Sequence, residues 1–259
     1  MEETILENII VAFSSGKDSV FLVNQLLKDP RYKIISLVTT CTINGNVTSH
    51  HIDEQLVEKQ AEAIRLPLYK IKMNEFTTEN FEDGLISTMV YFSKHFGVTK
   101  IAYGDLFLEE VKTYKEKLLA KYGFELLLPL WGRNTETLAR QLVEEGWKAA
   151  VISIDSTKLS SGFLGKNLTK EWLEALPPDV DPCGEYGEYH TFVYYGPIFQ
   201  YPIPIEIDYQ IINGRDRWKF VGIKLKGEEG IDDDVIKKYC EKCEKATELF
   251  RCLFHYCPR

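Results

Sequence analysis

The sequence lacks the features of several large protein classes. No apolar run is long enough to span a membrane, and the opening residues, Met1-Glu2-Glu3-Thr4, lack the basic-then-apolar order of a secretion signal. There is no internal repeat and no low-complexity segment. There is also no Lys/Arg-rich patch, and a net charge of −8 does not favour a broad nucleic-acid surface. We therefore expect a cytoplasmic protein with neither a membrane nor a nucleic acid as its partner.

The composition is that of an ordinary globular protein. The chain has 259 residues, of which 44% are hydrophobic and 27% charged, enough for one large domain or two small ones. It has six cysteines, and in the cytoplasm we do not expect them to form disulfides.

Strand-like and helical segments alternate through the first half of the chain. This order predicts a mostly parallel sheet with helices on both faces, and ligands of such sheets bind beyond the carboxyl ends of the strands. The strand-like runs are Ile9–Phe13, Ile34–Thr39, Leu68–Ile71, Lys100–Tyr103 and Glu125–Leu130.

The second half reads differently. A helical segment, Thr135–Glu145, and a strand, Ala149–Ile154, are followed by loops rich in Gly, Ser and Pro. Two alternating runs around Asn213-Gly214 then predict a hairpin. We therefore predict an α/β domain over 1–130, a smaller α+β domain over 131–228, and a cysteine-containing helical tail over 229–259.

The segment Ser14-Ser15-Gly16-Lys17-Asp18-Ser19 lies between the first strand and an apolar helix face. A small-residue loop that enters a helix points backbone N–H groups and the positive helix end at one spot, where an anion binds well. Lys17 adds a charge suited to phosphate. The segment is not a Walker loop, because Asp18 follows Gly16-Lys17 and no earlier Gly stands four residues before. The alternative is a strand–helix turn whose residues are small for steric reasons.

A second segment, Asp181–Thr191, carries two Gly, two Glu, a His and a Thr between a Pro-containing loop and a strand. Glu185 and Glu188 are three residues apart, so they could share a metal ion or orient an amine. The alternative for this segment alone is a Gly-rich turn with solvated glutamates.

Together the two segments give the chain a family resemblance. Ser14–Ser19 resembles the PP-loop, Ser-Gly-Gly-x-Asp-Ser, of enzymes that split ATP between its α and β phosphates. The chain as a whole resembles the diphthine–ammonia ligase family of adenine nucleotide α-hydrolase type, and looks most like its bacterial branch. The matching stretches are Ser14–Ser19, His50–Leu68, Tyr103-Gly104-Asp105, Leu130-Trp131-Gly132-Arg133-Asn134, Gly146–Ile154 and Asp181–Thr191.

The resemblance implies a HUP-type (Rossmann-like) nucleotide-binding domain and an ATP-dependent amide ligase. ATP would adenylate a carboxylate, pyrophosphate would leave, and ammonia would attack the acyl-adenylate. It implies that Lys17, Asp18, Glu185 and Glu188 are catalytic, with Asp18 beside Mg²⁺. The implied ATP-binding residues are Ser14, Ser15, Gly16, Lys17, Asp18, Ser19, Val38, Thr39, Gly104 and Asp105. The implied substrate-binding residues are His50, Trp131, Arg133, Gly184, Glu185, Glu188 and Thr191.

The chain departs from the family pattern at several positions. Ser15 stands where the family usually has Gly, and Tyr186 replaces a small residue or Asn within the Glu motif. If the position of Ser15 needs a positive φ, Ser costs about 1 kcal/mol there.

Three features have alternative interpretations. His50-His51 could bind metal or substrate, but such residues are more often part of a loop. Trp131-Gly132-Arg133 could stack on a ligand and bind its phosphate, or could anchor a domain junction. The tail cysteines Cys240, Cys243, Cys252 and Cys257 could hold Zn or an Fe–S cluster, although a helical apolar stripe that includes Cys243 is favoured.

The expected partners are ATP, ammonia and a carboxylate acceptor. By the resemblance, the acceptor is diphthine on elongation factor 2 in an archaeal or eukaryotic source, and otherwise a small acid. The sequence leaves a homodimer open. The rival functions are a PP-loop enzyme that modifies transfer RNA and a non-catalytic ATP-binding regulatory protein.

Overall fold

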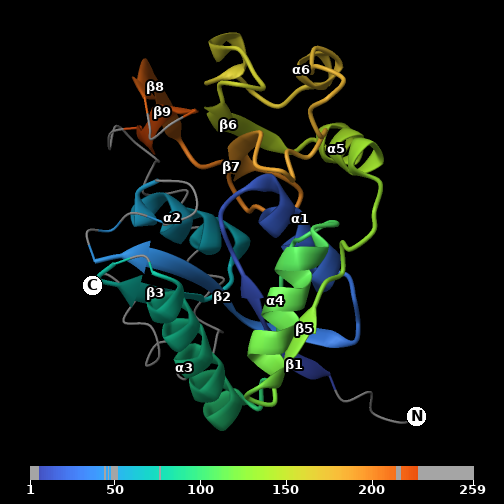
Figure 1. The fold of residues 1–259 in the computed structure, drawn as a ribbon, viewed down its shortest axis with the longest axis vertical. Helices are drawn as coiled ribbons and strands as arrows, with labels where there is room; N and C mark the ends of the chain where they lie inside the picture. Colours follow the sequence, from blue (N-terminus) through green and yellow to red (C-terminus); the bar gives the residue numbers. More distant parts are fainter. Residues whose placement is uncertain are drawn as a thin grey trace. The chain divides into compact units, whose positions relative to one another are not determined.

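The computed structural model describes residues 6–43, 45, 47, 52–75, 77–213 and 217–226. Two β-sheets, one parallel and one antiparallel, organise this part of the chain (Figure 1). Both sheets belong to one compact unit, Met1–Lys224, and a second unit, Leu225–Arg259, is described only at its first two residues.

The first sheet has five parallel strands in the order β3-β2-β1-β4-β5. Ile9 of β1 pairs with Ile34 of β2 on one side and with Lys100 of β4 on the other. The strand order therefore reverses at β1, which is where open α/β sheets bind ligands. This sheet confirms the predicted parallel α/β fold. Its strands are β1 (Glu7–Ala12), β2 (Tyr32–Thr42), β3 (Leu68–Met73), β4 (Lys100–Ala102) and β5 (Glu125–Leu127).

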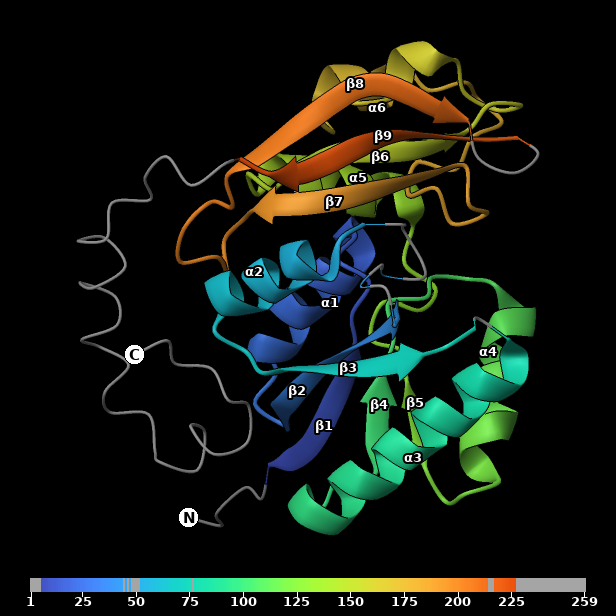
Figure 2. The ribbon, with the colours of Figure 1, turned by 90° about the vertical axis from the view of Figure 1, so that its left-hand side faces the viewer.

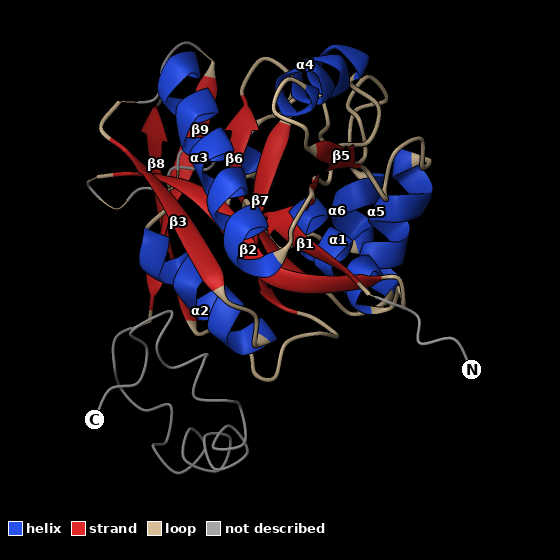
Figure 3. Ribbon diagram, turned by 90° about the horizontal axis from the view of Figure 1, so that it is seen from below, coloured by secondary structure: helices blue, strands red, loops and turns tan. Residues whose placement is uncertain are grey.

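Helices cover both faces of this sheet. On one face α3 (Thr78–Phe96) and α4 (Glu109–Ala120) bury apolar side chains such as Met89 and Leu119 against the strands. Figure 3 shows α3 lying across the strands on this face. On the other face α1 (Lys17–Leu27) and α2 (Glu54–Ile64) lie between the first sheet and the second (Figure 2).

The helix starts differ in one respect that matters for the site. Asp53 caps α2 by accepting a hydrogen bond from the Gln55 N–H, and Thr77 caps α3 in the same way through Asn80. Helix α1 begins after Gly16, which offers no side-chain cap. The N–H groups at the start of α1 therefore need partners from outside the helix.

The second sheet has the order β7-β6-β9-β8, and β6 is antiparallel to both of its neighbours. The neighbouring strands β8 and β9 are the predicted hairpin. The predicted boundary near Trp131 falls between β5 and α5 and stays a prediction, since both sheets share one compact unit. The elements are α5 (Thr135–Glu144), β6 (Lys148–Asp155), η1 (Ser161–Phe163), α6 (Lys170–Glu174), β7 (Tyr189–Tyr195), β8 (Ile205–Asn213) and β9 (Trp218–Leu225). A helix with the length and apolarity needed to cross a membrane does not occur among the described residues.

Candidate active site

The loop between β1 and α1 is held in a compact, strained shape. Ser15 has φ +72°, in the left-handed region that favours glycine. The Ser19 hydroxyl accepts a hydrogen bond from the Ser14 N–H at 3.3 Å and donates one to the Gly16 carbonyl at 3.0 Å. These hydrogen bonds join the loop to the first turn of α1. Ser15 adopts a backbone conformation that is usual for glycine.

The second sheet and α2 form hydrogen bonds with the same loop. The Thr191 hydroxyl on β7 accepts a hydrogen bond from the Lys17 N–H at 3.1 Å. The Ser15 carbonyl accepts hydrogen bonds from the Val193 N–H at 3.2 Å and from Gln60 Nε2 at 2.9 Å. Thr191, placed by sequence on the substrate side, thus supplies the cap that α1 lacks.

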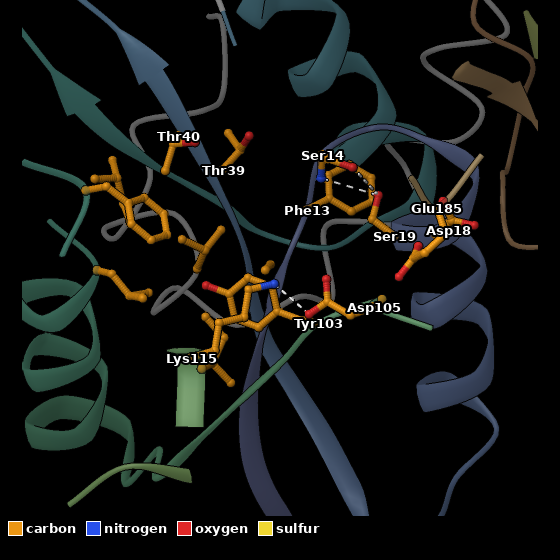
Figure 4. Close-up of a pocket in the computed structure, with 17 residues that line it drawn as sticks. Phe13, Ser14, Asp18, Ser19, Thr39, Thr40, Tyr103, Asp105, Lys115 and Glu185 are labelled. Atoms are coloured by element: carbon orange, nitrogen blue, oxygen red, sulfur yellow. Dashed lines mark hydrogen bonds and ion pairs between the residues drawn. The ribbon is translucent and has the colours of Figure 1, made fainter. Parts of the chain in front are cut away.

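A pocket of about 340 Å³ opens beside this loop, where β1, β2 and β4 end (Figure 4). Its volume lies within the roughly 300–1,000 Å³ of small-molecule sites. One part of its lining is polar and includes Ser14, Asp18 and Ser19. The lining also includes apolar and aromatic side chains, among them Phe13, Val38, Ile71, Phe81, Leu85, Ile101 and Tyr103. A lining of both kinds suits a ligand that has a flat apolar body and an anionic tail.

Six expected ATP-binding residues line the pocket in addition to Asp18. They are Ser14, Ser19, Val38, Thr39, Gly104 and Asp105. Gly104 is needed for close packing, because a Cβ there would lie 3.1 Å from the carbonyl carbon of Asp18. Ser15, Gly16 and Lys17 are not among the lining residues.

Lys17 is turned toward the second sheet. Its ammonium group is 2.9 Å from Asp18 Oδ2, donates to the Cys183 carbonyl and lies 4.9 Å from the centre of the Tyr189 ring. Lys17 as a whole is only 3% exposed to solvent. Burial alone lowers the pKa of Lys17, but the charge of Asp18, with Tyr189 and Cys183, outweighs it and raises the pKa above the usual value. Lys17 therefore ties the loop to the Cys183 turn as a permanent cation.

The structure separates the two glutamates of the second motif. Glu185 lines the pocket, and its Oε1 accepts a hydrogen bond from the Leu106 N–H at 2.8 Å. Glu188 is 3% exposed, is not among the lining residues, and accepts a hydrogen bond from the Asp181 N–H at 3.0 Å. Gly184 and Gly187 both have positive φ, so the backbone turns between the carboxylates. Gly184 also packs against Tyr189, because a Cβ there would lie 2.8 Å from the ring.

The pKa of Glu185 departs clearly from the usual value of a glutamate. Burial, together with the negative charges of Asp18 and Asp105, raises the pKa of Glu185 to about 7, against hydrogen bonds from the backbone of Leu106 and Phe107 that lower it. A carboxyl group poised near neutral pH can accept a proton during a reaction.

Trp131 and Arg133 lie outside the pocket lining. The ammonium of Lys112 lies 4.8 Å from the centre of the Trp131 ring. Arg133 Nη2 donates a hydrogen bond to Gln141 Oε1 at 2.8 Å, and its guanidinium lies over the Phe21 ring. The ligand-binding role and the junction-anchor role of Trp131-Gly132-Arg133 both stay predictions. His50 and the tail cysteines Cys240, Cys243, Cys252 and Cys257 fall outside the described residues.

The pocket residues fit ATP and Mg²⁺ in one specific respect. Asp18 Oδ1 is buried in the pocket wall and lacks a hydrogen-bond partner within the described part of the chain. Mg²⁺ in phosphate sites is usually held by one or two carboxylates together with the phosphates. The described residues contain no ready-made group of three or more His, Cys, Asp or Glu ligands. Asp18 is thus the residue that would hold Mg²⁺ through its free oxygen.

Two contacts of the site are not visible in the sequence alone. Lys115 of α4 lines the pocket, with its ammonium 2.5 Å from Asp105 Oδ2. Gln60 of α2 bridges the Ser15 carbonyl and the Val193 carbonyl. Lys115 is one of several lysines on its helix, so only the packing of α4 on the sheet selects it.

Comparison with known proteins gives two family matches that together cover most of the chain. The diphthamide synthase N-terminal domain matches residues 7–126, and the diphthamide synthase C-terminal domain matches residues 134–229. The two matches correspond to the halves that contain the parallel and the antiparallel sheet.

Individual relatives are more distant. The diphthine–ammonia ligase of Homo sapiens is 25% identical over 251 residues, covering 88% of this chain and 93% of its own. That of Rattus norvegicus is 24% identical over 244 residues, covering 85% and 91%. A crystal structure described as a predicted subunit of tRNA methyltransferase from Methanocaldococcus jannaschii overlaps 60% of this chain and 81% of its own, with 21% identity and a TM-score of 0.35, too low to carry an argument. On the strength of its two domain matches, the chain belongs to the diphthamide synthase family.

Proposed function

We propose that this protein is an ATP-dependent amide ligase that joins ammonia to a carboxylate. ATP would be split between its α and β phosphates, releasing pyrophosphate, and the acceptor carboxylate would be linked to AMP. Ammonia nitrogen would then form the C–N bond while the acyl–oxygen bond to AMP breaks. We further propose that the reaction takes place in the cytoplasm.

The observation that carries this proposal is that Glu185 reaches the pocket from the segment just before β7 and lies beside Asp18 at the start of α1 (Figure 4). One part of the pocket has the start of α1 with Ser14 and Ser19, which suits phosphate oxygens. Its apolar part, which includes Val38, suits a base. A binding-only module needs no carboxyl group with a pKa near 7 beside the phosphate loop.

We assign the residues the following roles. Ser14, Ser19 and the open N–H groups of α1 would bind phosphate, and Asp18 would hold Mg²⁺, which would neutralise phosphate charge. Glu185 would take the proton that the attacking nitrogen loses. Lys17, Thr191 and Glu188 would keep the loop and the Asp181–Thr191 segment in register rather than touch substrate.

The acceptor follows from the relatives by analogy only. Since the relatives are named diphthine–ammonia ligases, the first acceptor to test is elongation factor 2 that carries diphthine. Small carboxylic acids form the second set, because diphthine is not the expected acceptor if the source is bacterial.

The experiment supplies purified protein with ATP, Mg²⁺, ¹⁵N-ammonium and each acceptor. We expect AMP and pyrophosphate in equal amounts, and ¹⁵N in the acceptor amide. The matched variant Glu185→Gln should bind ATP but form no amide. Release of ADP and phosphate, or AMP release without ¹⁵N incorporation into any acceptor, would contradict ligase activity. ATP binding with no turnover in any mixture would favour the non-catalytic alternative.

A further inference from the structure

The charges lining the pocket are unbalanced. Three carboxyl groups line it, those of Asp18, Asp105 and Glu185. Among the described lining residues, Lys115 is the only one with a cationic side chain. A phosphate-bearing ligand would bring further negative charge into this space, so it would need positive partners there, and Lys115 is the described lining side chain that can provide one in addition to Mg²⁺.

Lys17 does not supply this charge in the described geometry. Its ammonium is already engaged by Asp18, the Cys183 carbonyl and the Tyr189 ring, on the side of the second sheet. Moving it into the pocket would break all three contacts at a residue only 3% exposed. Lys17, which the sequence predicted to bind phosphate, instead connects the loop before α1 to Cys183 and to Tyr189 of β7.

Lys115 has a different environment. It comes from α4, and its ammonium lies between Asp105 Oδ2 at 2.5 Å and the Tyr103 ring, whose centre is 4.0 Å away (Figure 4). Its side chain is 13% exposed and faces the pocket. Both partners also line the pocket, so the ammonium of Lys115 faces the space that a ligand would occupy.

We propose that Lys115 is the phosphate-binding cation of this pocket, and that it exchanges its ion pair with Asp105 for an oxygen of the bound nucleotide phosphate. The identity of that nucleotide as ATP rests on the function proposed above. The exchange replaces one charge-assisted hydrogen bond by another, so it costs little, whereas losing the ammonium leaves phosphate and Asp105 facing each other. In the described geometry the Tyr103 ring is the second partner of the Lys115 ammonium, 4.0 Å from its centre.

The test compares ATP with adenosine, since only ATP carries phosphate. Binding of each ligand with Mg²⁺ is measured by isothermal titration calorimetry on the full chain and on Lys115→Met. The matched control is Lys117→Met, an exposed lysine on the same helix. Lys115→Arg tests whether a cation of different shape restores binding. Thermal unfolding of each variant checks that it is folded.

We expect Lys115→Met to weaken ATP binding at least 10-fold and adenosine binding less than 2-fold, with Lys115→Arg recovering part of the loss and Lys117→Met changing neither. Unchanged ATP affinity in Lys115→Met would overturn the proposal. An equal loss for ATP and adenosine would overturn it too, because it would mean that Lys115 only supports the pocket wall. The ligase proposal fails separately, if the wild-type chain binds ATP as expected here but makes no amide.

Discussion

The hydroxyl of Thr191 accepts a hydrogen bond from the backbone N–H of Lys17 at 3.1 Å, across 174 positions of sequence. Thr191 is 2% exposed and belongs to β7 of the antiparallel sheet, whereas Lys17 is the first residue of α1. One side chain of the second sheet therefore caps the helix whose start is the proposed phosphate site. If that proposal holds, this contact couples the fold of the second sheet to nucleotide binding beside the first.

Thr191→Val should weaken both stability and ATP binding. It leaves the buried Lys17 N–H without its acceptor, which costs about 1–3 kcal/mol of unfolding free energy. Thr191→Ser is the matched variant, since it keeps the hydroxyl and loses only a buried methyl group, worth about 0.8 kcal/mol. Urea unfolding and ATP titration measure the two effects. If Ser and Val lowered ATP affinity equally, the hydroxyl would have no part in orienting α1.

Ser15→Gly should stabilise the protein by about 1 kcal/mol. The φ of Ser15 is +72°, where a side chain costs about 1–2 kcal/mol, and the gain is reduced by the extra freedom of Gly in the unfolded chain. The Ser15 hydroxyl is also buried and unpaired among the described residues. Ser15→Ala separates the two causes, because it removes the hydroxyl but keeps the Cβ. Equal stabilisation by Gly and Ala in urea unfolding would assign the effect to the hydroxyl alone.

Local patterns in the sequence predicted the architecture of the first sheet. The five apolar runs became β1 to β5 because each is flanked by an amphipathic helix that must cover the sheet. The sequence raised a positive φ at Ser15 only as a condition, because the family usually has Gly there, and the structure meets that condition.

Contacts between distant segments could not be predicted in the same way. The spacing of Glu185 and Glu188 suggested a shared role, but Gly184 and Gly187 rotate the backbone between them, and the two carboxylates bind the N–H groups of different loops. Lys115 was missed because several lysines on α4 look alike until the helix is docked on the sheet. Tertiary packing decides these cases, and local spacing does not encode it.

Gly104→Ala should lower ATP affinity by disturbing the start of α1. The new Cβ would lie 3.1 Å from the Asp18 carbonyl carbon and 3.2 Å from its oxygen, so the helix start or β4 must shift. Overpacking of this kind costs roughly 1–3 kcal/mol. Gly162→Ala is the control, because its Cβ would meet only the Ser160 hydroxyl, at 3.5 Å. An ATP affinity equal to that of the control variant would mean that the helix start is free to move without affecting the site.

The raised pKa of Glu185 predicts opposite effects of pH on stability and activity. Between its usual value of 4.5 and about 7, the folded protein holds a proton that the unfolded chain has lost. The stability contributed by this group is therefore full below about pH 4.5 and falls as pH rises to about 7. Activity should rise over the upper part of that range, since a base must be ionised to accept a proton.

Glu185→Gln should remove this group's contribution to the pH dependence of both stability and activity, because a glutamine side chain does not titrate. Between pH 5 and 7, its free energy of unfolding in urea should fall by less than that of the wild type. Its amide formation should be abolished at every pH. Glu144→Gln, an exposed position on α5, is the control and should follow the wild type in both measurements. Because the two readouts move in opposite directions with pH, general acid denaturation cannot imitate the result. A wild-type activity profile that is flat through pH 7, with Glu185→Gln still active, would remove Glu185 from the proton transfer.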